Sequence, residues 1–191
     1  MNDNDKRVQR TKIKIRNALF KLLDRQTIDK ITVKSIIDEA GLNRTTFYSY
    51  YTDKYDLLEK VQENTIKQII QIKHDYPVTG GDSLGDTHQL VKTYFSALFK
   101  FVQDHHQEVK LLLINSSKIT VLRNMTNQNP EFYEHWRPVI IRIRGVAPEH
   151  SYAALVGVVI NFYFDFEDHD YKTDPEKIAS VLADIVTRYM Q

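Results

Sequence analysis

The sequence predicts an all-α protein with an N-terminal three-helix domain and a larger C-terminal helical domain. Apolar residues recur every three or four positions along most of the chain, and the alternation typical of strands is nearly absent. The segment 77–88, PVTGGDSLGDTH, holds three of the six glycines and predicts a flexible linker. We place the domain boundary after residue 52, so that residues 1–52 form the first domain and residues 53–191 the second.

Composition narrows the classes of protein to consider. The 191 residues are 42% hydrophobic and 27% charged, which is typical of soluble globular proteins. No apolar run reaches the length of about 18 residues that a membrane helix needs, and the N-terminus MNDNDKRVQRTK has no apolar segment for a secretory signal. With no cysteine, disulfides, thiolate zinc sites and thiol nucleophiles are excluded. We therefore expect a cytoplasmic, nucleoid-associated protein with no membrane partner and no cofactor.

Positive charge is concentrated near the N-terminus. Residues 1–60 contain 13 Lys and Arg against 9 Asp and Glu, and ten of the basic residues lie between Lys6 and Lys34. Such a bias favours a surface that binds a polyanion, with a solvated helix face as the alternative.

Local signals predict the helices of the first domain. The leading helix carries the apolar stripe Ile15, Ala18, Leu19, Leu22 and Leu23. Thr32 is a good N-cap for a second helix over residues 33–40, with Ile31 and Ile36 at the staple positions. Gly41 ends that helix, and Asn43 caps the next one. A fourth helix begins at Asp53 and runs to about Tyr76.

Two short helices joined by a tight turn are typical of a helix-turn-helix. The support helix is 33–40, the turn is 41–43, and the recognition helix runs from Arg44 to about Tyr50. Phe47 and Tyr51 fall on the inward side. The side chains expected to contact base edges are polar and exposed: Arg44, Thr45 and Ser49. Those expected to contact phosphates are Thr32, Lys34, Thr46, Tyr48 and Lys54, aided by the N-terminus of the fourth helix.

The segment AGLNRTTFYSYYTDKYDLL, residues 40–58, resembles the core of TetR-type bacterial transcriptional regulators. The resemblance covers roughly residues 8–60 and rests on the Gly turn, the short polar helix, the aromatic run, the Lys and the paired Leu residues. The family often has Gly where Thr45 stands and an acidic residue where Tyr55 stands. The resemblance implies a homodimer on a palindromic double-stranded DNA operator, with a C-terminal sensor and dimerisation domain.

Helices are expected in the second domain at 90–105, 108–115, 130–144 and 152–164, and after the cap signature Asp174-Pro175-Glu176. Aromatic residues there are candidates for a pocket that holds a small apolar or aromatic ligand, with plain core as the alternative. The candidate pocket residues are Phe95, Phe99, Tyr133, Trp136 and Phe162. Arg142 and Arg144 are candidates to meet an anionic ligand, or else are solvated.

The helix YAALVGVVINFYF, residues 152–164, is apolar nearly all round and must be covered on more than one side. We expect it to pair with the last helix in an intermolecular four-helix bundle; the alternative is a helix buried in its own domain. The candidate dimer-interface residues are Val156, Val159, Ile178, Leu182 and Ile185.

Signals for metal binding and catalysis are weak. His105-His106-x-Glu108 and the acidic run 165–170 contain metal-ligand types without a second cluster, and no nucleophile elbow or phosphate-binding Gly loop is present. We therefore expect no enzymatic activity, and the resemblance to TetR-type regulators implies a ligand-responsive repressor. The alternatives are a regulator without a small-molecule inducer, acting as an activator or a protein-responsive switch, and a helical interaction module.

Overall fold

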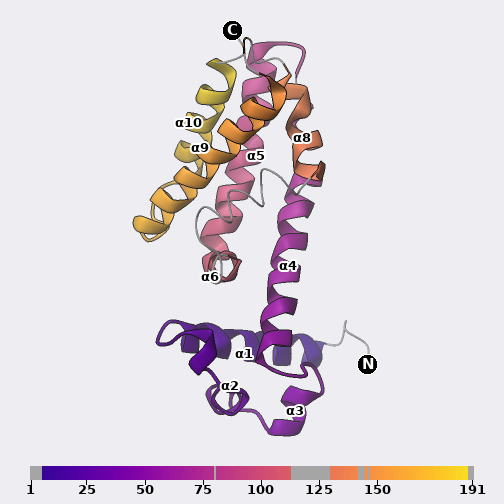
Figure 1. Cartoon of the computed structure of the whole chain (residues 1–191), viewed down its shortest axis with the longest axis vertical. Coiled ribbons are helices and arrows are strands. Elements are labelled where there is room, and N and C mark those ends of the chain that lie inside the picture. Colours follow the sequence, from indigo (N-terminus) through magenta and orange to yellow (C-terminus); the bar gives the residue numbers. More distant parts are fainter. Residues whose placement is uncertain (1–5, 80, 113–129, 142–144, 146, 189–191) are drawn as a thin grey trace. The chain divides into compact units, whose positions relative to one another are not determined.

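The computed structural model describes residues 6–79, 81–112, 130–141, 145 and 147–188. Every regular element in these ranges is a helix, which confirms the predicted all-α class (Figure 1). The elements are α1 (Lys6–Leu23), the short 3₁₀ helix η1 (Ile28–Lys30), α2 (Val33–Ala40), α3 (Arg44–Tyr48), α4 (Lys54–Asp75), α5 (Leu84–Asp104), α6 (His106–Leu111), α8 (Pro130–Ile140), α9 (Pro148–Asp168) and α10 (Pro175–Arg188).

The chain divides into two compact units, residues 1–64 and residues 65–191. Helix α4 runs from the first unit into the second. The division differs from the predicted boundary after residue 52 by about three turns of α4. The assignment of residues 1–52 to the DNA-binding domain stays a prediction.

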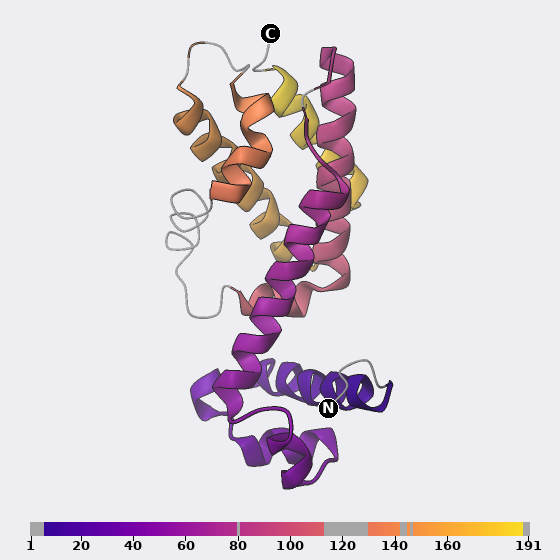
Figure 2. The ribbon, with the colours of Figure 1, turned by 90° about the vertical axis from the view of Figure 1, so that its right-hand side faces the viewer.

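The first unit is built around the apolar face of α1, on which α2 packs. Ile15 and Leu19 are fully buried, together with Ile36 of α2, Phe47 of α3 and Leu57 of α4. Four of the five residues of the predicted α1 stripe are buried, and Leu23 is half-buried. Figure 2 shows this unit at the indigo and violet end of the colour scale.

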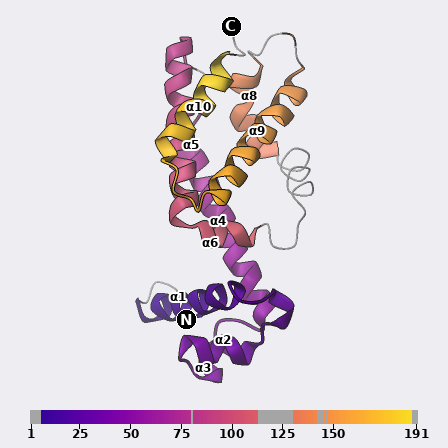
Figure 3. The same ribbon diagram turned by 90° about the vertical axis from the view of Figure 1, so that its left-hand side faces the viewer.

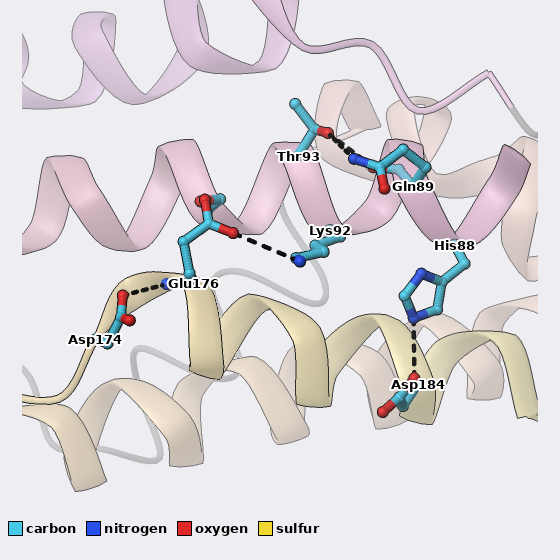
Figure 4. Close-up of polar contacts among 8 residues, drawn as sticks. His88, Gln89, Lys92, Thr93, Asp174, Glu176 and Asp184 are labelled. Carbon is cyan, nitrogen blue, oxygen red and sulfur yellow. Dashed lines mark hydrogen bonds and ion pairs between the residues drawn. The ribbon is translucent and has the colours of Figure 1, made fainter. Parts of the chain in front are cut away.

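In the second unit α10 packs along α5 (Figure 3). Two polar contacts join these helices: His88 Nε2 lies 2.9 Å from Asp184 Oδ1 in a hydrogen bond, and Lys92 Nζ lies 3.6 Å from Glu176 Oε2 in an ion pair (Figure 4). Helix α9 packs against α8 and α10. The apolar faces of these helices form one core that includes Phe95, Trp136 and Phe166.

The predicted linker 77–88 is too long at its C-terminal end. Helix α5 already begins at Leu84, because Ser83 and Asp86 form a capping box in which each side chain accepts a backbone N–H of the other residue. Val78 is buried in the core of the second unit. The connection between α4 and α5 is therefore short and partly packed, and residues 84–88 are helical.

Candidate DNA-binding site

Caps at three places set the geometry of α2 and α3. Thr32 Oγ1 accepts a hydrogen bond from the Ser35 backbone N–H at 3.0 Å, and Ser35 Oγ accepts one from the Thr32 N–H. Gly41 ends α2 in the left-handed conformation with φ +62°, which a residue with a Cβ adopts only with strain. Asn43 Oδ1 accepts the N–H of Thr46 at 2.8 Å and caps α3. The predicted caps are confirmed.

Phe47 fixes which face of α3 points outward. Its side chain is fully buried, and its ring lies 5.7 Å from that of buried Tyr51. Arg44, Thr45 and Tyr48 are exposed. The predicted inward pair and three of the predicted DNA-facing residues therefore lie on the expected sides of the unit.

Arg44 and Tyr48 form a pair on the exposed face of α3. The Arg44 guanidinium carbon lies 5.4 Å from the centre of the Tyr48 ring, and Nη2 lies 3.5 Å from the Tyr48 hydroxyl. Positions four apart meet on one helix face, and a guanidinium stacks well on an aromatic ring. The contact limits the rotamers of Arg44 before any DNA is bound.

Thr46 and Ser49 use their hydroxyl protons within the unit. Thr46 Oγ1 donates to Asn43 Oδ1 at 2.7 Å, and Ser49 Oγ donates to the Thr46 carbonyl at 2.8 Å. A phosphate oxygen needs a donor. In this structure Thr46 therefore reinforces the cap of α3 in place of the predicted phosphate contact, whereas Ser49 keeps an acceptor that faces solvent.

Lys54 is engaged by the backbone of the first unit. Its Nζ donates to the carbonyls of Ile28 at 2.9 Å, Asp29 at 3.0 Å and Ile31 at 2.7 Å. An ammonium group has three donors, so none is left for the predicted phosphate contact. The lysine instead ties the start of α4 to the end of η1. No sequence signal indicates this contact, because its partners lie more than twenty positions away in the chain.

Carboxylates already occupy the N-terminus of α4. Asp53 Oδ1 accepts the N–H groups of Tyr55 at 2.7 Å and Asp56 at 2.9 Å, and Asp56 Oδ2 accepts that of Thr52 at 2.7 Å. The Thr52 hydrogen bond, followed by that from Lys60, holds the pKa of Asp56 below its usual value. The expected binding of a phosphate at this helix end is therefore disfavoured, because two carboxylates lie there.

Thr32 and Lys34 lie exposed at the start of α2. Lys34 Nζ is 3.3 Å from Asp38 Oδ2, and both side chains are well exposed. A surface pair of this kind is weak and breaks readily. The ammonium of Lys34 therefore remains available to a DNA backbone, whereas the Thr32 hydroxyl donates to Ser35 Oγ at 3.3 Å and would have to turn to reach one.

The aromatic residues predicted to line a ligand pocket lie in or against the core of the second unit. Phe95, Phe99 and Trp136 are buried, and the rings of Phe95 and Trp136 stack with centres 5.1 Å apart. Tyr133 and Phe162 are partly buried against the same core. The burial of Phe95, Phe99 and Trp136 fits the alternative that these residues belong to the hydrophobic core and do not line a pocket. Arg142 and Arg144 lie outside the described residues.

Two of the predicted dimer-interface residues belong to the core of their own unit. Ile178 and Leu182 are 4% and 0% exposed and face α5, so they are not free to contact a second chain. Val156 and Val159 are partly buried against the core, and Ile185 is partly exposed. The dimer prediction needs to be revised at Ile178 and Leu182.

Within the residues that the structure describes, no group of three or more His, Cys, Asp or Glu side chains is arranged to hold a metal ion. No helix among them is long and apolar enough to cross a membrane.

Helix α2, the turn at Gly41 and helix α3 form the two short helices and the tight turn of a helix-turn-helix. Residues 15–61 match the family model for "Bacterial regulatory proteins, tetR family". The match spans about a quarter of the chain, so the chain is similar to TetR-type regulators in its helix-turn-helix segment. A comparison with curated proteins gave no match.

Solved structures share the fold over nearly the whole chain. The fatty acid degradation regulator FadR from Bacillus halodurans is similar with a TM-score of 0.66 and 15% identity, covering 93% of this chain and 94% of that one. A gamma-butyrolactone receptor, described as ArpA-like, gives a TM-score of 0.53 and 16% identity, covering 95% and 98%. At such identities the likeness concerns the fold alone.

Proposed function

We propose that the protein is a ligand-responsive repressor that binds a roughly palindromic operator as a homodimer. The observation that carries the proposal is the outward face of α3, where Arg44, Thr45 and Tyr48 are exposed over a fully buried Phe47. A recognition helix presents such side chains to the major groove.

In this proposal Arg44, Thr45 and Ser49 contact base edges. Arg44 is placed to donate two hydrogen bonds to a guanine, which is the commonest specific contact of arginine with DNA. Tyr48 contacts a phosphate with its hydroxyl once Arg44 turns to the base. Thr32 and Lys34 hold the backbone at the start of α2, where their side chains are exposed.

A dimer is proposed because one recognition helix buries little DNA surface, and two matching half-sites lie about 34 Å apart. The outward sides of α9 and α10 support it. On α9, Ala154 and Asn161 are exposed, and a Cβ placed at Gly157 would meet nothing within 4 Å. On α10, Val181 is 45% exposed. An apolar and small-residue face of this kind allows the close approach of a second copy.

Ligand response is proposed as a population shift. Helix α4 contributes residues to both compact units, so a change in the second unit acts on the first through one continuous helix. A ligand that prefers one arrangement of α4 would favour a separation of the two recognition helices that no longer matches the operator. An inducer-free regulator remains the alternative, and the close packing of Phe95 with Trp136 favours it.

The test begins with selection of bound sequences from a random DNA pool. Arg44→Ala is then compared with wild type on the selected operator and on variants at each position. Loss of one bidentate contact costs about 1–3 kcal/mol and relaxes the preference at one base pair. Arg25→Ala is the matched control, because that arginine is exposed and only weakly paired with Glu39 at 3.9 Å. If Arg44→Ala kept the affinity and the base preference of the wild type, the assignment of Arg44 as a base contact would be refuted.

The dimer is tested separately by sedimentation and by operator titration. Val181→Glu places a charge on the exposed face of α10, and we expect monomers that bind the operator weakly. Equal operator affinity of the monomeric variant and the wild-type dimer would refute the dimer mechanism.

A further inference from the structure

The exposed side chain of Arg44 on α3 lies against the ring of Tyr48, one helical turn further along the chain. The guanidinium carbon is 5.4 Å from the ring centre, and Nη2 is 3.5 Å from the hydroxyl. Side chains in a helix lean toward the preceding turn, so the ring at position 48 reaches the side chain four positions before it. The contact restrains Arg44, whereas a fully solvated arginine samples many rotamers.

The Tyr48 ring is itself fixed by the core of the first unit. Its centre lies 5.6 Å from that of Phe47, and the two ring planes meet edge to face at 85°. Phe47 is fully buried and packs against the buried ring of Tyr51. Edge-to-face aromatic pairs are favourable beyond the area that they bury. A chain of contacts therefore runs from the core through Phe47 and Tyr48 to Arg44, although Tyr48 itself is 44% exposed.

The ring and the hydroxyl of Tyr48 can act separately. In the contact with Arg44 the guanidinium N–H is the donor and the phenol oxygen is the acceptor, so the phenol keeps its own proton for a phosphate oxygen. A guanidinium carries five N–H donors, so donors remain for a base edge while one is directed at the phenol. The side chain at position 48 can thus support a base contact and make a phosphate contact.

We propose that Tyr48 is a positioning residue for base reading by Arg44. Its ring holds the guanidinium on the outward face of α3, and this restraint raises the preference of the protein for one base pair. On the matching base pair, the restrained guanidinium loses little conformational freedom when it binds. On a non-matching base pair Arg44 makes no bidentate contact, so the restraint adds nothing there. This role rests on the proposed function, because it requires that α3 reads the operator.

Two substitutions separate the ring from the hydroxyl. Tyr48→Phe keeps the ring, so we expect it to weaken binding to all sequences about equally and to keep the base preference, because every sequence offers the same phosphates. Tyr48→Leu removes the ring as well. We expect it to lower the ratio of the affinities for the matching and the non-matching base pair by about two- to fivefold, which corresponds to a cation–π contact at an exposed site.

The affinities are measured with the full-length protein on two duplexes. One is the operator selected from the random DNA pool, and the other is changed at the base pair whose preference Arg44→Ala relaxes. Tyr76→Leu is the matched control and should keep the wild-type preference, because Tyr76 is a tyrosine of the second unit that is 40% exposed. The double variant with Arg44→Ala and Tyr48→Leu should show the preference of Arg44→Ala alone, since the ring acts through Arg44.

A measurement without DNA follows the contact itself. In NMR spectra of the free protein, the Nε–Hε signal that is absent in Arg44→Ala should show a ring-current shift and restricted motion on the ps–ns timescale. Both features should persist in Tyr48→Phe and disappear in Tyr48→Leu. Circular dichroism identifies a variant that fails to fold. If Tyr48→Leu does not fold, Tyr48→Met, which also lacks a ring, replaces it in both experiments.

Four results would overturn the positioning role of Tyr48. They are a mobile Arg44 signal in the free wild type, a wild-type base preference in the folded variant without a ring, an equal loss of preference in Tyr48→Phe, and a further loss when Tyr48→Leu is added to Arg44→Ala. If Arg44→Ala relaxes the base preference and Tyr48→Leu does not, the proposed function stands and the positioning role is refuted. If Arg44→Ala leaves affinity and preference unchanged, the proposed function is refuted, and the positioning role with it.

Discussion

Replacing Lys54 with Met tests whether this lysine stabilises the first unit or contacts DNA. The substitution keeps the aliphatic length and removes three hydrogen bonds from Nζ to the carbonyls of Ile28, Asp29 and Ile31. The backbone between η1 and α2 would then lose its connection to the start of α4.

The expected cost follows from the surroundings of each carbonyl. The contacts to Ile28 at 2.9 Å and Ile31 at 2.7 Å are partly buried, whereas the Asp29 carbonyl is exposed and rehydrates. A hydrogen bond to a charged group contributes about 1.5–3 kcal/mol. With the lower value for the two partly buried bonds, Lys54→Met should reduce the free energy of unfolding by about 3 kcal/mol.

Guanidinium unfolding and amide hydrogen exchange measure this effect. Exchange should accelerate in residues 28–36, because the backbone next to the lost contacts opens more often. Lys34→Met is the matched control, since Lys34 is exposed and makes one surface ion pair of 3.3 Å. We expect it to change stability by less than about 0.5 kcal/mol and to reduce the salt dependence of operator binding by about one phosphate contact.

The reverse pattern would refute the reasoning. If Lys54→Met left stability and exchange unchanged and instead lowered the salt dependence of DNA binding, Lys54 would be a phosphate contact as its sequence position suggested. The three carbonyl contacts would then contribute nothing measurable to the free energy of unfolding.

Three further predictions concern other parts of the chain. Gly41→Ala should lower the free energy of unfolding by about 1–2 kcal/mol, because φ at this position is +62°. Gly85→Ala is the control, since Gly85 is helical and a Cβ there would make only an ordinary contact, so we expect no such loss. Denaturant titration compares the two variants. Because the folded pKa of His135 is depressed from 6.5 to about 4, the unfolded chain binds the extra proton, so stability should fall as pH drops from 6.5 toward 4. Denaturation at several pH values should show this loss in wild type and a smaller one in His135→Phe. Leu182→Ala should cost about 2–5 kcal/mol as a core cavity, and Val181→Glu, on the outward side of α10, should change sedimentation with little loss of stability.

Short-range signals predicted the first unit well. Thr32, Gly41 and Asn43 act through bonds to residues three or four positions away, so the residue types alone indicate each cap. The buried side of α3 followed from the spacing of Phe47 and Tyr51. The same kind of signal was present at Ser83 and Asp86, where the neighbouring glycines suggested a linker instead of the start of α5.

Long-range contacts had no such signal. The Lys54 contacts depend on how η1 lies beside α4, and the isolation of His135 Nε2 depends on which helices surround α8. The spacing of residues that are close in the sequence predicts neither arrangement. Lys54 therefore becomes a structural residue and His135 Nε2 stays without a partner, and the local sequence indicates neither outcome.

The last helix shows how an apolar stripe divides between core and interface. Ile178, Val181, Leu182 and Ile185 are all apolar at helical spacing, and Val181 lies at one edge of the arc of about 100° that they span. In the structure Ile178 and Leu182 are buried toward α5, whereas Val181 is 45% exposed and Ile185 is partly exposed. The side chain of Val181 therefore contributes little to the core of its own unit. Its exposure is explained if a second copy of the chain covers this edge of the stripe, and this makes the outward side of α10 the place to disrupt the proposed dimer without unfolding the protein.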